Sequence, residues 1–302
     1  MAAKVFIDGE AGTTGLQILE RLENRSDVSL ISVDPARRKE AAARAEAFAA
    51  ADIAILCLPD AAAIEAVAMA GDTRIIDAST AHRIAPGWTY GMPELPDQRE
   101  AIAKASHVAN VGCYATGSIA LIRPLRDAGI LGADHTATLT GISGYTGGGK
   151  ALIAEYEAGT APALFLYAMG QGHKHVPEIM RYGRLDRQPA FQPAVGNFAQ
   201  GMVVQLHLHR DALIGNPDKE ALSAALADFY ADARFVTVAD APDRIDPQAV
   251  NGTNEMRLSV HGDDAAGIWT LTATLDNLGK GASGTAVQNL NLMIGAAEDA
   301  GL

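Results

Sequence analysis

The sequence predicts an α/β protein with a doubly wound parallel sheet, followed by a second α+β domain with a mixed or antiparallel sheet. The chain has 302 residues, more than one hydrophobic core usually serves. Its first third alternates continuous apolar runs with helical segments, as in parallel strands and their crossovers. Beyond Gly129, apolar and polar residues alternate within the runs. We therefore expect two domains, residues 1–113 completed by a C-terminal helix over 282–302, and residues 114–281.

The first domain is expected to open with a strand, because Lys4-Val-Phe-Ile-Asp8 is a short apolar run that ends in a glycine cluster. Apolar residues from Leu16 to Leu22 then recur at helical spacing, which predicts a helix. The same alternation continues along the chain. It predicts strands at 29–33, 53–58, 74–77 and 107–109, and helices at 36–50 and 61–70.

The second domain is expected to contain strands with partial alternation of apolar and polar residues. A final helical stripe, which includes Val287, Leu290 and Met293, predicts a closing helix over 282–300 that packs on another layer. The strands expected in this domain are 136–140, 203–209, 235–238, 255–260 and 269–275.

Charge and composition exclude several classes of protein. The formal net charge of -12 argues against nucleic acid or an anionic membrane as a partner, since both are bound through Lys and Arg. No apolar run has the length of a signal peptide or of a membrane span, so we expect a cytoplasmic protein. Cys57 and Cys113 are the only cysteines, which makes a disulfide framework or a cysteine-rich metal site an unfavoured interpretation.

A glycine-rich turn follows the first expected strand, in Gly9-Glu-Ala-Gly12-Thr-Thr-Gly15. Glycines let a backbone turn tightly and approach a pyrophosphate, and the amides at the start of the next helix favour an anion. This predicts a Rossmann-type dinucleotide site. The alternative is a turn that only packs the helix on the strand. The site would contain Gly9, Gly12, Thr13, Thr14 and Gly15.

The end of the second expected strand bears on the choice between NAD and NADP. Asp34 lies 19 positions after Gly15, where an acid would bind a ribose hydroxyl and favour NAD. However, Arg37-Arg38-Lys39 follows at once, and such cations attract a 2'-phosphate. We give the basic cluster more weight and predict NADP, held by Arg37 and Arg38. The alternative is the solvated first turn of a helix.

Cys113 is the candidate nucleophile. It lies in Asn110-Val-Gly-Cys-Tyr-Ala-Thr-Gly117, directly before an apolar-periodic segment, and so at the start of an expected helix. Unpaired amides and the helix dipole stabilise thiolate over thiol, and thiolate is the reactive form. Cys57 lies inside an apolar strand and fits a structural cysteine.

A histidine-rich segment, Gly170-Gln-Gly-His-Lys-His-Val-Pro-Glu178, is the candidate source of an acid/base. Imidazole titrates in the range that thioester chemistry needs. His173 and His175 could instead bind a metal, but no further ligand cluster with zinc spacing accompanies them, so we expect no metal. A surface loop without function is the other alternative.

Several segments together resemble a known family, the short form of the N-acetyl-gamma-glutamyl-phosphate reductases of arginine biosynthesis, which are relatives of aspartate-semialdehyde dehydrogenase. The resemblance covers nearly the whole chain. It is carried by the glycine turn, Asp77-Ala-Ser-Thr-Ala-His-Arg83, the Cys113 segment, Ile142-Ser-Gly-Tyr-Thr-Gly-Gly-Gly-Lys150, the histidine segment, and Asp276-Asn-Leu-Gly-Lys-Gly-Ala-Ser-Gly284 with Gln288-Asn289.

The resemblance implies a mechanism for these residues. Cys113 would expel phosphate from an acyl phosphate, and NADPH would reduce the resulting thioester to a semialdehyde. Of the two histidines, we assign the acid/base to His175, with His173 as the alternative, and expect His173 or Glu178 to orient it. The resemblance also implies a homodimer or homotetramer, with a small acyl phosphate and phosphate as the bound partners.

The resemblance further implies which residues line the two pockets. Two departures from the family pattern are visible, Val111 where a proline is common, and Thr80-Ala-His82 where an aspartate and a phenylalanine usually precede the arginine. The substrate pocket would contain Arg83, Asn110, Ser143, Gly144 and Lys150, and the cofactor site would also contain Pro59, Ser79, Asn277 and Gly281.

Two kinds of alternative function remain. The chain could reduce aspartyl phosphate, or a carrier-linked glutamyl or aminoadipyl phosphate, because Arg83 or Lys150 could hold the carboxylate of any of them. It could also be a dinucleotide-binding sensor that kept the fold without the chemistry. The presence of both Cys113 and the histidine pair argues against the sensor.

Overall fold

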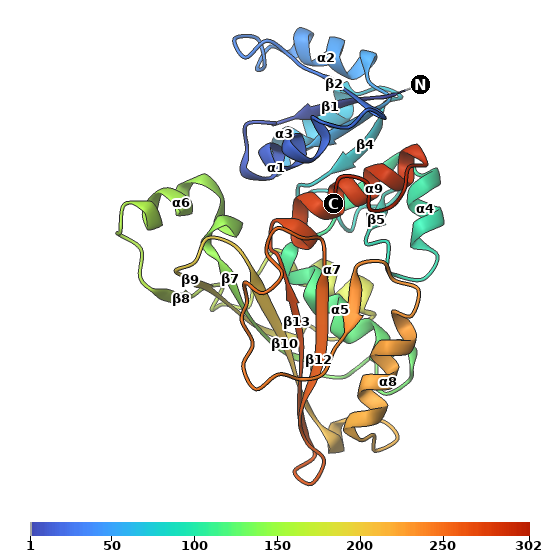
Figure 1. The fold of residues 1–302 in the computed structure, drawn as a ribbon, viewed down its shortest axis with the longest axis vertical. Helices are drawn as coiled ribbons and strands as arrows, with labels where there is room; N and C mark the ends of the chain where they lie inside the picture. Colours follow the sequence, from blue (N-terminus) through green and yellow to red (C-terminus); the bar gives the residue numbers. More distant parts are fainter. Residues whose placement is uncertain (1) are drawn as a thin grey trace. The chain divides into compact units, whose positions relative to one another are not determined.

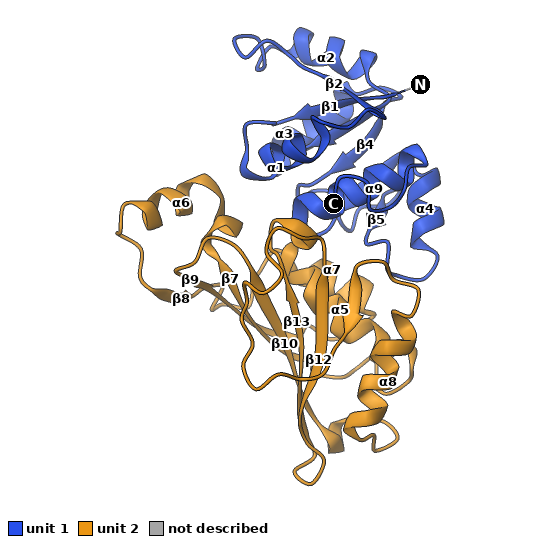
Figure 2. Ribbon diagram, in the orientation of Figure 1, with its two compact units in different colours: residues 1–111, 282–302 blue, residues 112–281 orange. Residues whose placement is uncertain are grey.

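The computed structural model describes residues 2–302, which form two compact units (Figure 1). Unit 1 comprises the chain up to Val111 together with Ala282–Leu302, and unit 2 comprises Gly112–Gly281 (Figure 2). The sheet of unit 1 is parallel throughout, and the sheet of unit 2 is mixed. The fold class predicted from the sequence is therefore confirmed.

Unit 1 is built on six parallel strands. The second strand of the chain pairs with one edge of the first strand, and the third strand pairs with its other edge. The strand order therefore reverses at the first strand. In open α/β sheets, ligands bind outside the carboxyl ends of the strands at such a reversal. The strands lie in the order β2 (Val28–Ile31), β1 (Ala3–Asp8), β3 (Ile53–Leu56), β4 (Arg74–Asp77), β6 (His107–Asn110) and β5 (Thr89–Gly91).

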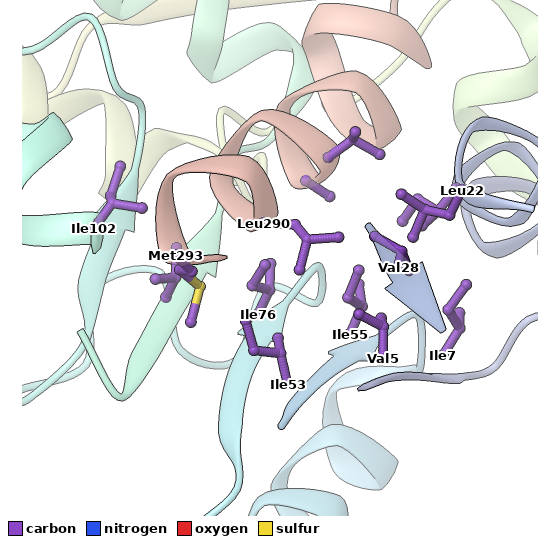
Figure 3. Packing of buried hydrophobic residues seen from close by; sticks show 14 residues of the cluster. Val5, Ile7, Leu22, Val28, Ile53, Ile55, Ile76, Ile102, Leu290 and Met293 are labelled. Carbon is purple, nitrogen blue, oxygen red and sulfur yellow. The ribbon is translucent and has the colours of Figure 1, made fainter. Parts of the chain in front are cut away.

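Helices cover both faces of this sheet; they are α1 (Thr13–Leu22), α2 (Ala41–Ala50), α3 (Asp60–Met69), α4 (Gln98–Lys104) and α9 (Gly284–Ile294). Alternate side chains of the central strands reach two separate cores. Val5 and Ile7 of β1 pack with Ile18 of α1 and Leu290 of α9 (Figure 3). Phe6 packs with α2 and α3 instead. The continuous apolar runs in the sequence reflect this two-sided burial.

Two helix boundaries in unit 1 differ from the prediction. α2 begins at Ala41 and not at residue 36, because residues 34–40 form turns in which the Ala36 amide donates to Asp34 Oδ1 at 2.9 Å. α9 ends at Ile294 and not at residue 300, because Gly295 adopts a left-handed conformation (φ 70°) that terminates the helix. Both β5 and α4 were absent from the prediction.

Unit 2 contains a seven-stranded mixed sheet in which β7 and β9, and β11 and β12, pair in parallel and the other neighbours are antiparallel. Neither β8 nor β9 was predicted. The strands lie in the order β11 (Val236–Val238), β12 (Met256–Asp263), β13 (Ile268–Leu275), β10 (Met202–His209), β7 (Thr138–Gly144), β9 (Ala190–Gly196) and β8 (Leu164–Leu166).

The helices of unit 2 are α5 (Cys113–Asp127), α6 (Gly149–Glu157), α7 (Val176–Gly183) and α8 (Lys219–Phe229), with short turns at Tyr145–Gly148 and Arg210–Ala212. A further turn, Gly279–Ser283, precedes α9. α5 lies very close to the sheet, because a Cβ atom at Gly117 would come within 2.7 Å of Val204. α5 also contacts α7 and α8. This packing fixes the start of α5, where Cys113 lies, against the rest of unit 2.

Residues 2–302 lack two features that would indicate a membrane or a metal ion as a partner. None of the helices is both long enough and apolar enough to cross a membrane. The same residues contain no group of three or more His, Cys, Asp or Glu side chains that could hold a metal ion.

Leu290 provides a test of the core of unit 1. Its side chain is fully buried between α9 and the sheet, so Leu290→Ala removes apolar contact and leaves a cavity (Figure 3). We expect it to lower the free energy of unfolding by about 2–5 kcal/mol. Urea titration followed by circular dichroism measures this loss. Ile64→Ala, on an exposed position of α3, is the control and should change stability by less than about 0.5 kcal/mol. Equal losses would contradict the assigned core.

Candidate active site

The glycine turn joins β1 to α1 and has the shape of a phosphate cradle. Gly9 has a positive φ of 92°, and a Cβ atom there would lie 2.4 Å from the carbonyl oxygen of Cys57. A Cβ atom at Gly15 would lie 2.5 Å from the carbonyl oxygen of Gly9. Gly12 occupies the N-cap of α1 and has no side chain to cap the amides of Thr13 and Thr14. The residues present therefore fit a dinucleotide pyrophosphate.

The basic cluster lies in the turn before α2. Arg37, Arg38 and Lys39 are all exposed to solvent. Arg37 Nε pairs with Glu40 Oε2 at 3.0 Å, and an exposed pair of this kind is weak enough to exchange for a phosphate. Asp34 is also exposed, and one of its carboxylate oxygens already accepts the Ala36 amide. The cluster thus follows β2 but is not part of a helix.

Two further predicted cofactor residues follow the carboxyl ends of neighbouring strands. Pro59 is exposed and occupies the N-cap of α3, after β3. Ser79 follows β4 and is buried, and its hydroxyl donates to Asp77 Oδ2 at 2.6 Å. The same carboxylate oxygen lies 2.6 Å from His82 Nδ1, and the His82 ring stacks on Trp88 with 4.1 Å between centroids. This network holds the loop after β4.

Arg83 and Asn110 use their polar side chains inside unit 1. Arg83 is buried, and its guanidinium donates to the carbonyl oxygens of Asn110 at 3.0 Å and Val111 at 3.4 Å. Asn110 Nδ2 donates to the carbonyl oxygen of Ala282, and Asn110 Oδ1 accepts from Asn289 Nδ2 at 3.0 Å. These bonds hold the backbone that leads into Gly112 and join β6 to α9. Both residues were predicted in the substrate pocket, and here each positions backbone.

Cys113 is the first residue of α5, as the sequence predicted. Gly112 occupies the N-cap in an extended conformation, and its carbonyl oxygen accepts the amide of Thr116 at 2.8 Å. The thiol therefore lies at the positive end of the helix dipole, which favours a negative sulfur. Gly281 lies against it, because a Cβ atom at Gly281 would come within 2.7 Å of Cys113 Cβ. Only glycine leaves this space beside the cysteine.

The histidine segment lies beside the cysteine segment. Glu178, in the first turn of α7, is almost completely buried and accepts the Gly112 amide on Oε2 at 3.3 Å. Its other oxygen lies 4.0 Å from His175 Nε2. The rings of His173 and His175 lie 5.8 Å and 6.2 Å from the ring of Tyr114, the residue after Cys113. The structure thus brings together the candidate nucleophile and the candidate acid/base, which the sequence could not do.

His173 and His175 differ in their hydrogen bonds. The backbone amide of His175 donates to His173 Nδ1 at 3.1 Å, so this nitrogen of His173 carries a lone pair and no proton. A protonated His173 would lose that bond. In contrast, His175 Nε2 lies 4.0 Å from a carboxylate oxygen of Glu178. A backbone amide thus fixes the tautomer of His173, whereas a carboxylate lies near the ring of His175.

Two tyrosines at this site were missed by the sequence reasoning. Tyr114 donates from its hydroxyl to the carbonyl oxygen of Ala194 at 2.6 Å. Tyr167 Oη lies 3.2 Å from His173 Nε2. The available signal was the aromatic pair Phe165 and Tyr167, shortly before the histidine segment. This aromatic pair lies in and directly after β8, a strand that was not predicted from the sequence, so the place of Tyr167 beside His173 could not be inferred.

The other predicted residues of unit 2 lie around the end of β7 and in α6. Asn277 Oδ1 accepts the Gly201 amide at 2.7 Å, and Asn277 Nδ2 donates to Thr146. Ser143 is buried, and its hydroxyl donates to the carbonyl oxygen of Gly144. Lys150 is exposed in α6. Its predicted role in holding the substrate therefore depends on contacts with the bound substrate itself.

Cys57 has the properties of a structural cysteine. Burial, together with the nearby carboxylates of Asp77 and Asp8, raises the pKa of its thiol to about 12. The thiol therefore stays protonated at neutral pH and is a poor nucleophile. Cys57 directly follows β3, and its substitution can serve as a control for substitution of Cys113.

Two family profiles match most of the chain. The profile for the semialdehyde dehydrogenase NAD binding domain matches residues 4–105. The profile for the semialdehyde dehydrogenase dimerisation domain matches residues 113–277. Among curated proteins, the N-acetyl-gamma-glutamyl-phosphate reductase of Brucella anthropi is 51% identical over 309 residues, covering 98% of this chain and 99% of that protein. That of a Chelativorans species is 52% identical, covering 97% and 99%.

Solved structures with the same fold are semialdehyde dehydrogenases of low sequence identity. Aspartate semialdehyde dehydrogenase II of Vibrio cholerae, complexed with ASA, has a TM-score of 0.75 at 17% identity, covering 97% of this chain and 98% of that one. The aspartate semialdehyde dehydrogenase of Candida albicans, with NADP, has a TM-score of 0.70 at 13% identity, with the same coverage. At these identities, the likeness concerns the fold alone.

Proposed function

This chain belongs to the semialdehyde dehydrogenase family, among the N-acetyl-gamma-glutamyl-phosphate reductases, and we propose that it reduces N-acetyl-gamma-glutamyl phosphate to N-acetylglutamate 5-semialdehyde with release of phosphate. This is a step of arginine biosynthesis. The observation that carries the proposal is the meeting of Cys113, at the start of α5, with the segment that bears His175 and Glu178. Unit 1 would hold the cofactor, and unit 2 would hold the acyl group and mediate assembly.

In the proposed mechanism, the Cys113 thiolate attacks the acyl carbon of the acyl phosphate. A carbon–sulfur bond forms, the carbon–oxygen bond to phosphate breaks, and phosphate leaves with the electron pair. When bound, NADPH supplies the hydride that reduces this thioester. The carbon–sulfur bond then breaks, which releases the aldehyde and returns the electron pair to Cys113. His175 would take the thiol proton at the start and give a proton to the departing group.

Glu178 would support this proton exchange with both of its carboxylate oxygens. One of its oxygens holds the Gly112 amide, directly before Cys113, and the other lies near His175 Nε2. The carboxylate therefore couples the orientation of the imidazole to the backbone that carries the thiol. We propose that substrate contacts come from Ser143, Gly144 and Lys150, while Arg83 and Asn110 act through the backbone that they hold.

The cofactor is a nicotinamide dinucleotide, and we propose that it is NADP. The pyrophosphate would lie on the turn from Gly9 to Gly15, where side chains are absent and helical amides are free. The exposed cations before α2 would hold the 2'-phosphate. Pro59 and Ser79, at the carboxyl ends of β3 and β4, would line the same site.

Neutralising the basic cluster tests the cofactor. The double variant Arg37→Gln, Arg38→Gln is expected to raise the KM for NADP at least about 10-fold and leave that for NAD nearly unchanged, because two charge-assisted bonds to the 2'-phosphate are lost. Steady-state kinetics with both cofactors measures this ratio. Lys104→Gln, an exposed cation of α4, is the control. If NADP and NAD respond equally, the cluster is only a solvated turn.

The chain is further proposed to assemble as a homodimer or homotetramer through the sheet of unit 2. Val204 of β10 faces α5. Because side chains alternate along a strand, Gln205 and His207 of β10 lie on the opposite face of the sheet. That face is polar and half-buried, and two leucines of β8, Leu164 and Leu166, are each 51% exposed on it. A second copy would cover these side chains. Light scattering in solution measures the assembly.

A direct assay tests the whole function. The reverse reaction supplies N-acetylglutamate 5-semialdehyde, phosphate and NADP, and reports reduced cofactor by absorbance. We expect turnover that depends strictly on phosphate. Replacing the N-acetylated substrate by aspartate semialdehyde tests the alternative that the enzyme is a reductase of aspartyl phosphate. Equal turnover with both aldehydes, or turnover without phosphate, would contradict the proposal.

A further inference from the structure

Tyr167 occupies a defined place in a chain of hydrogen bonds at the candidate active site. The backbone amide of His175 donates to His173 Nδ1 at 3.1 Å, and His173 Nε2 lies 3.2 Å from Tyr167 Oη. Since Nδ1 accepts, the proton of the neutral His173 ring is on Nε2, which donates to the tyrosine oxygen. Tyr167 therefore accepts a hydrogen bond from His173 and does not donate its own hydroxyl proton to that ring.

The neighbouring tyrosine does not compete for the same role. Tyr114 gives its own proton to the carbonyl oxygen of Ala194, at 2.6 Å. Burial raises the pKa of Tyr167 above its usual value and the nearby Cys113 also raises it, while a hydrogen bond with the Tyr114 hydroxyl lowers it. Burial and nearby groups, including Tyr167 and Cys113, likewise raise the pKa of Tyr114. Both phenols thus stay protonated at neutral pH, and Tyr167 can act as a hydrogen-bond donor but not as a base.

The loop that carries Tyr167 is held in a costly conformation. Ala168 and Gln171, neither of them glycine, have positive φ angles of 51° and 61°. Such residues persist only where surrounding contacts hold them, and they are common at functional sites. Gln171 supplies these contacts, because its side-chain oxygen accepts the Phe191 amide and its carbonyl oxygen accepts from Gln188, both at 2.9 Å. The loop therefore places Tyr167 firmly beside His173.

We propose that Tyr167 is a further catalytic residue, whose hydroxyl donates a hydrogen bond to the acyl oxygen of the intermediate on Cys113, and that His173 is the residue that positions it. The proposal rests on the thioester mechanism above. No bond breaks at Tyr167, which keeps its proton throughout. Its donation stabilises the negative charge that grows on the acyl oxygen during attack by the thiolate and during reduction.

The test compares Tyr167→Phe with Tyr156→Phe. Tyr156 is a buried tyrosine of α6 whose hydroxyl has no hydrogen-bond partner among residues 2–302, so it controls for the loss of a hydroxyl in unit 2. We expect Tyr167→Phe to lower kcat about 100-fold with a nearly unchanged KM, as for removal of one oxyanion donor. Tyr156→Phe should keep its kcat within a factor of about three. A similar small change in both variants would overturn the proposal.

A second variant separates donation from structure. Replacing Tyr167 by 3,5-difluorotyrosine keeps the shape and lowers the pKa of the phenol, so kcat should fall at a lower pH than in the wild-type enzyme. An unshifted alkaline limb would rule out a donor at this position. Mass spectrometry distinguishes failure of this proposal from failure of the mechanism. With acyl phosphate and no NADPH, Tyr167→Phe should still acquire the acyl mass on Cys113, whereas no adduct even in the wild-type enzyme would reject the thioester itself.

Discussion

Cys113→Ser is expected to retain the fold and cofactor binding and to lose about 10⁴-fold or more in kcat. Serine keeps the shape of the side chain, but its hydroxyl is almost wholly protonated at neutral pH, even at the N-terminus of α5. It therefore cannot supply the nucleophile that attacks an acyl phosphate. Steady-state kinetics measures the loss, and fluorescence titration with NADPH checks that binding is unchanged.

Cys57→Ser is the matched control, because that thiol is held protonated by its surroundings and should not take part in the reaction. Most of the activity should remain in this variant. Incubation of wild-type protein with the acyl phosphate, without NADPH, should place the acyl mass on the peptide that contains Cys113. An active Cys113→Ser variant, or an adduct found only on another peptide, would refute the mechanism.

His175→Asn is expected to lower kcat about 10²- to 10⁴-fold with little effect on substrate binding, since a positioned acid/base typically contributes that much. Asparagine keeps a polar side chain of similar reach but cannot exchange a proton. The nearby Glu178 carboxylate, 4.0 Å from His175 Nε2, would then have no imidazolium to stabilise. The rate of a single turnover, measured by rapid mixing, separates this chemical defect from slow product release.

Two other histidines complete this experiment. His209→Asn, at an exposed position at the end of β10, should leave kcat unchanged. His173→Asn should cost less than His175→Asn, because His173 serves as a neutral ring between the His175 amide and Tyr167. If His173→Asn gives the more severe loss, the two roles are exchanged. If neither substitution affects turnover, the segment is structural.

The parallel sheet of unit 1 was largely predictable because five of its six strands carry their own signal in the sequence. The strand Arg74–Asp77 was predicted with the bounds that the structure has, and Ile53–Leu56 lies within the predicted run. By contrast, β9 contains Pro193 and several small or polar residues, which read as a loop. It is a strand because it pairs with β7, about 50 positions earlier in the chain. Pairing of this kind leaves little trace in the local sequence.

The site was predictable to a similar extent. The place of Cys113 at a helix start followed from its neighbours, and the structure agrees. The polar partners were not predictable in the same way. Arg83 was expected at the substrate, yet its guanidinium holds backbone carbonyls of Asn110 and Val111. A long cation has many acceptors within reach, and only the folded chain decides which of them it meets.

By itself, the sequence determined the two-part α/β architecture, the glycine turn and the position of the candidate nucleophile, because periodicity, turn residues and helix starts are encoded over a few neighbouring positions. The tertiary structure decided that Glu178 joins the backbone before Cys113 to His175, and that Tyr167 reaches His173. Glu178 and Gly112 are 66 positions apart, and their contact depends on α7 packing against α5. Contacts over such separations follow from the order of the strands and the packing of the helices, which no local pattern specifies.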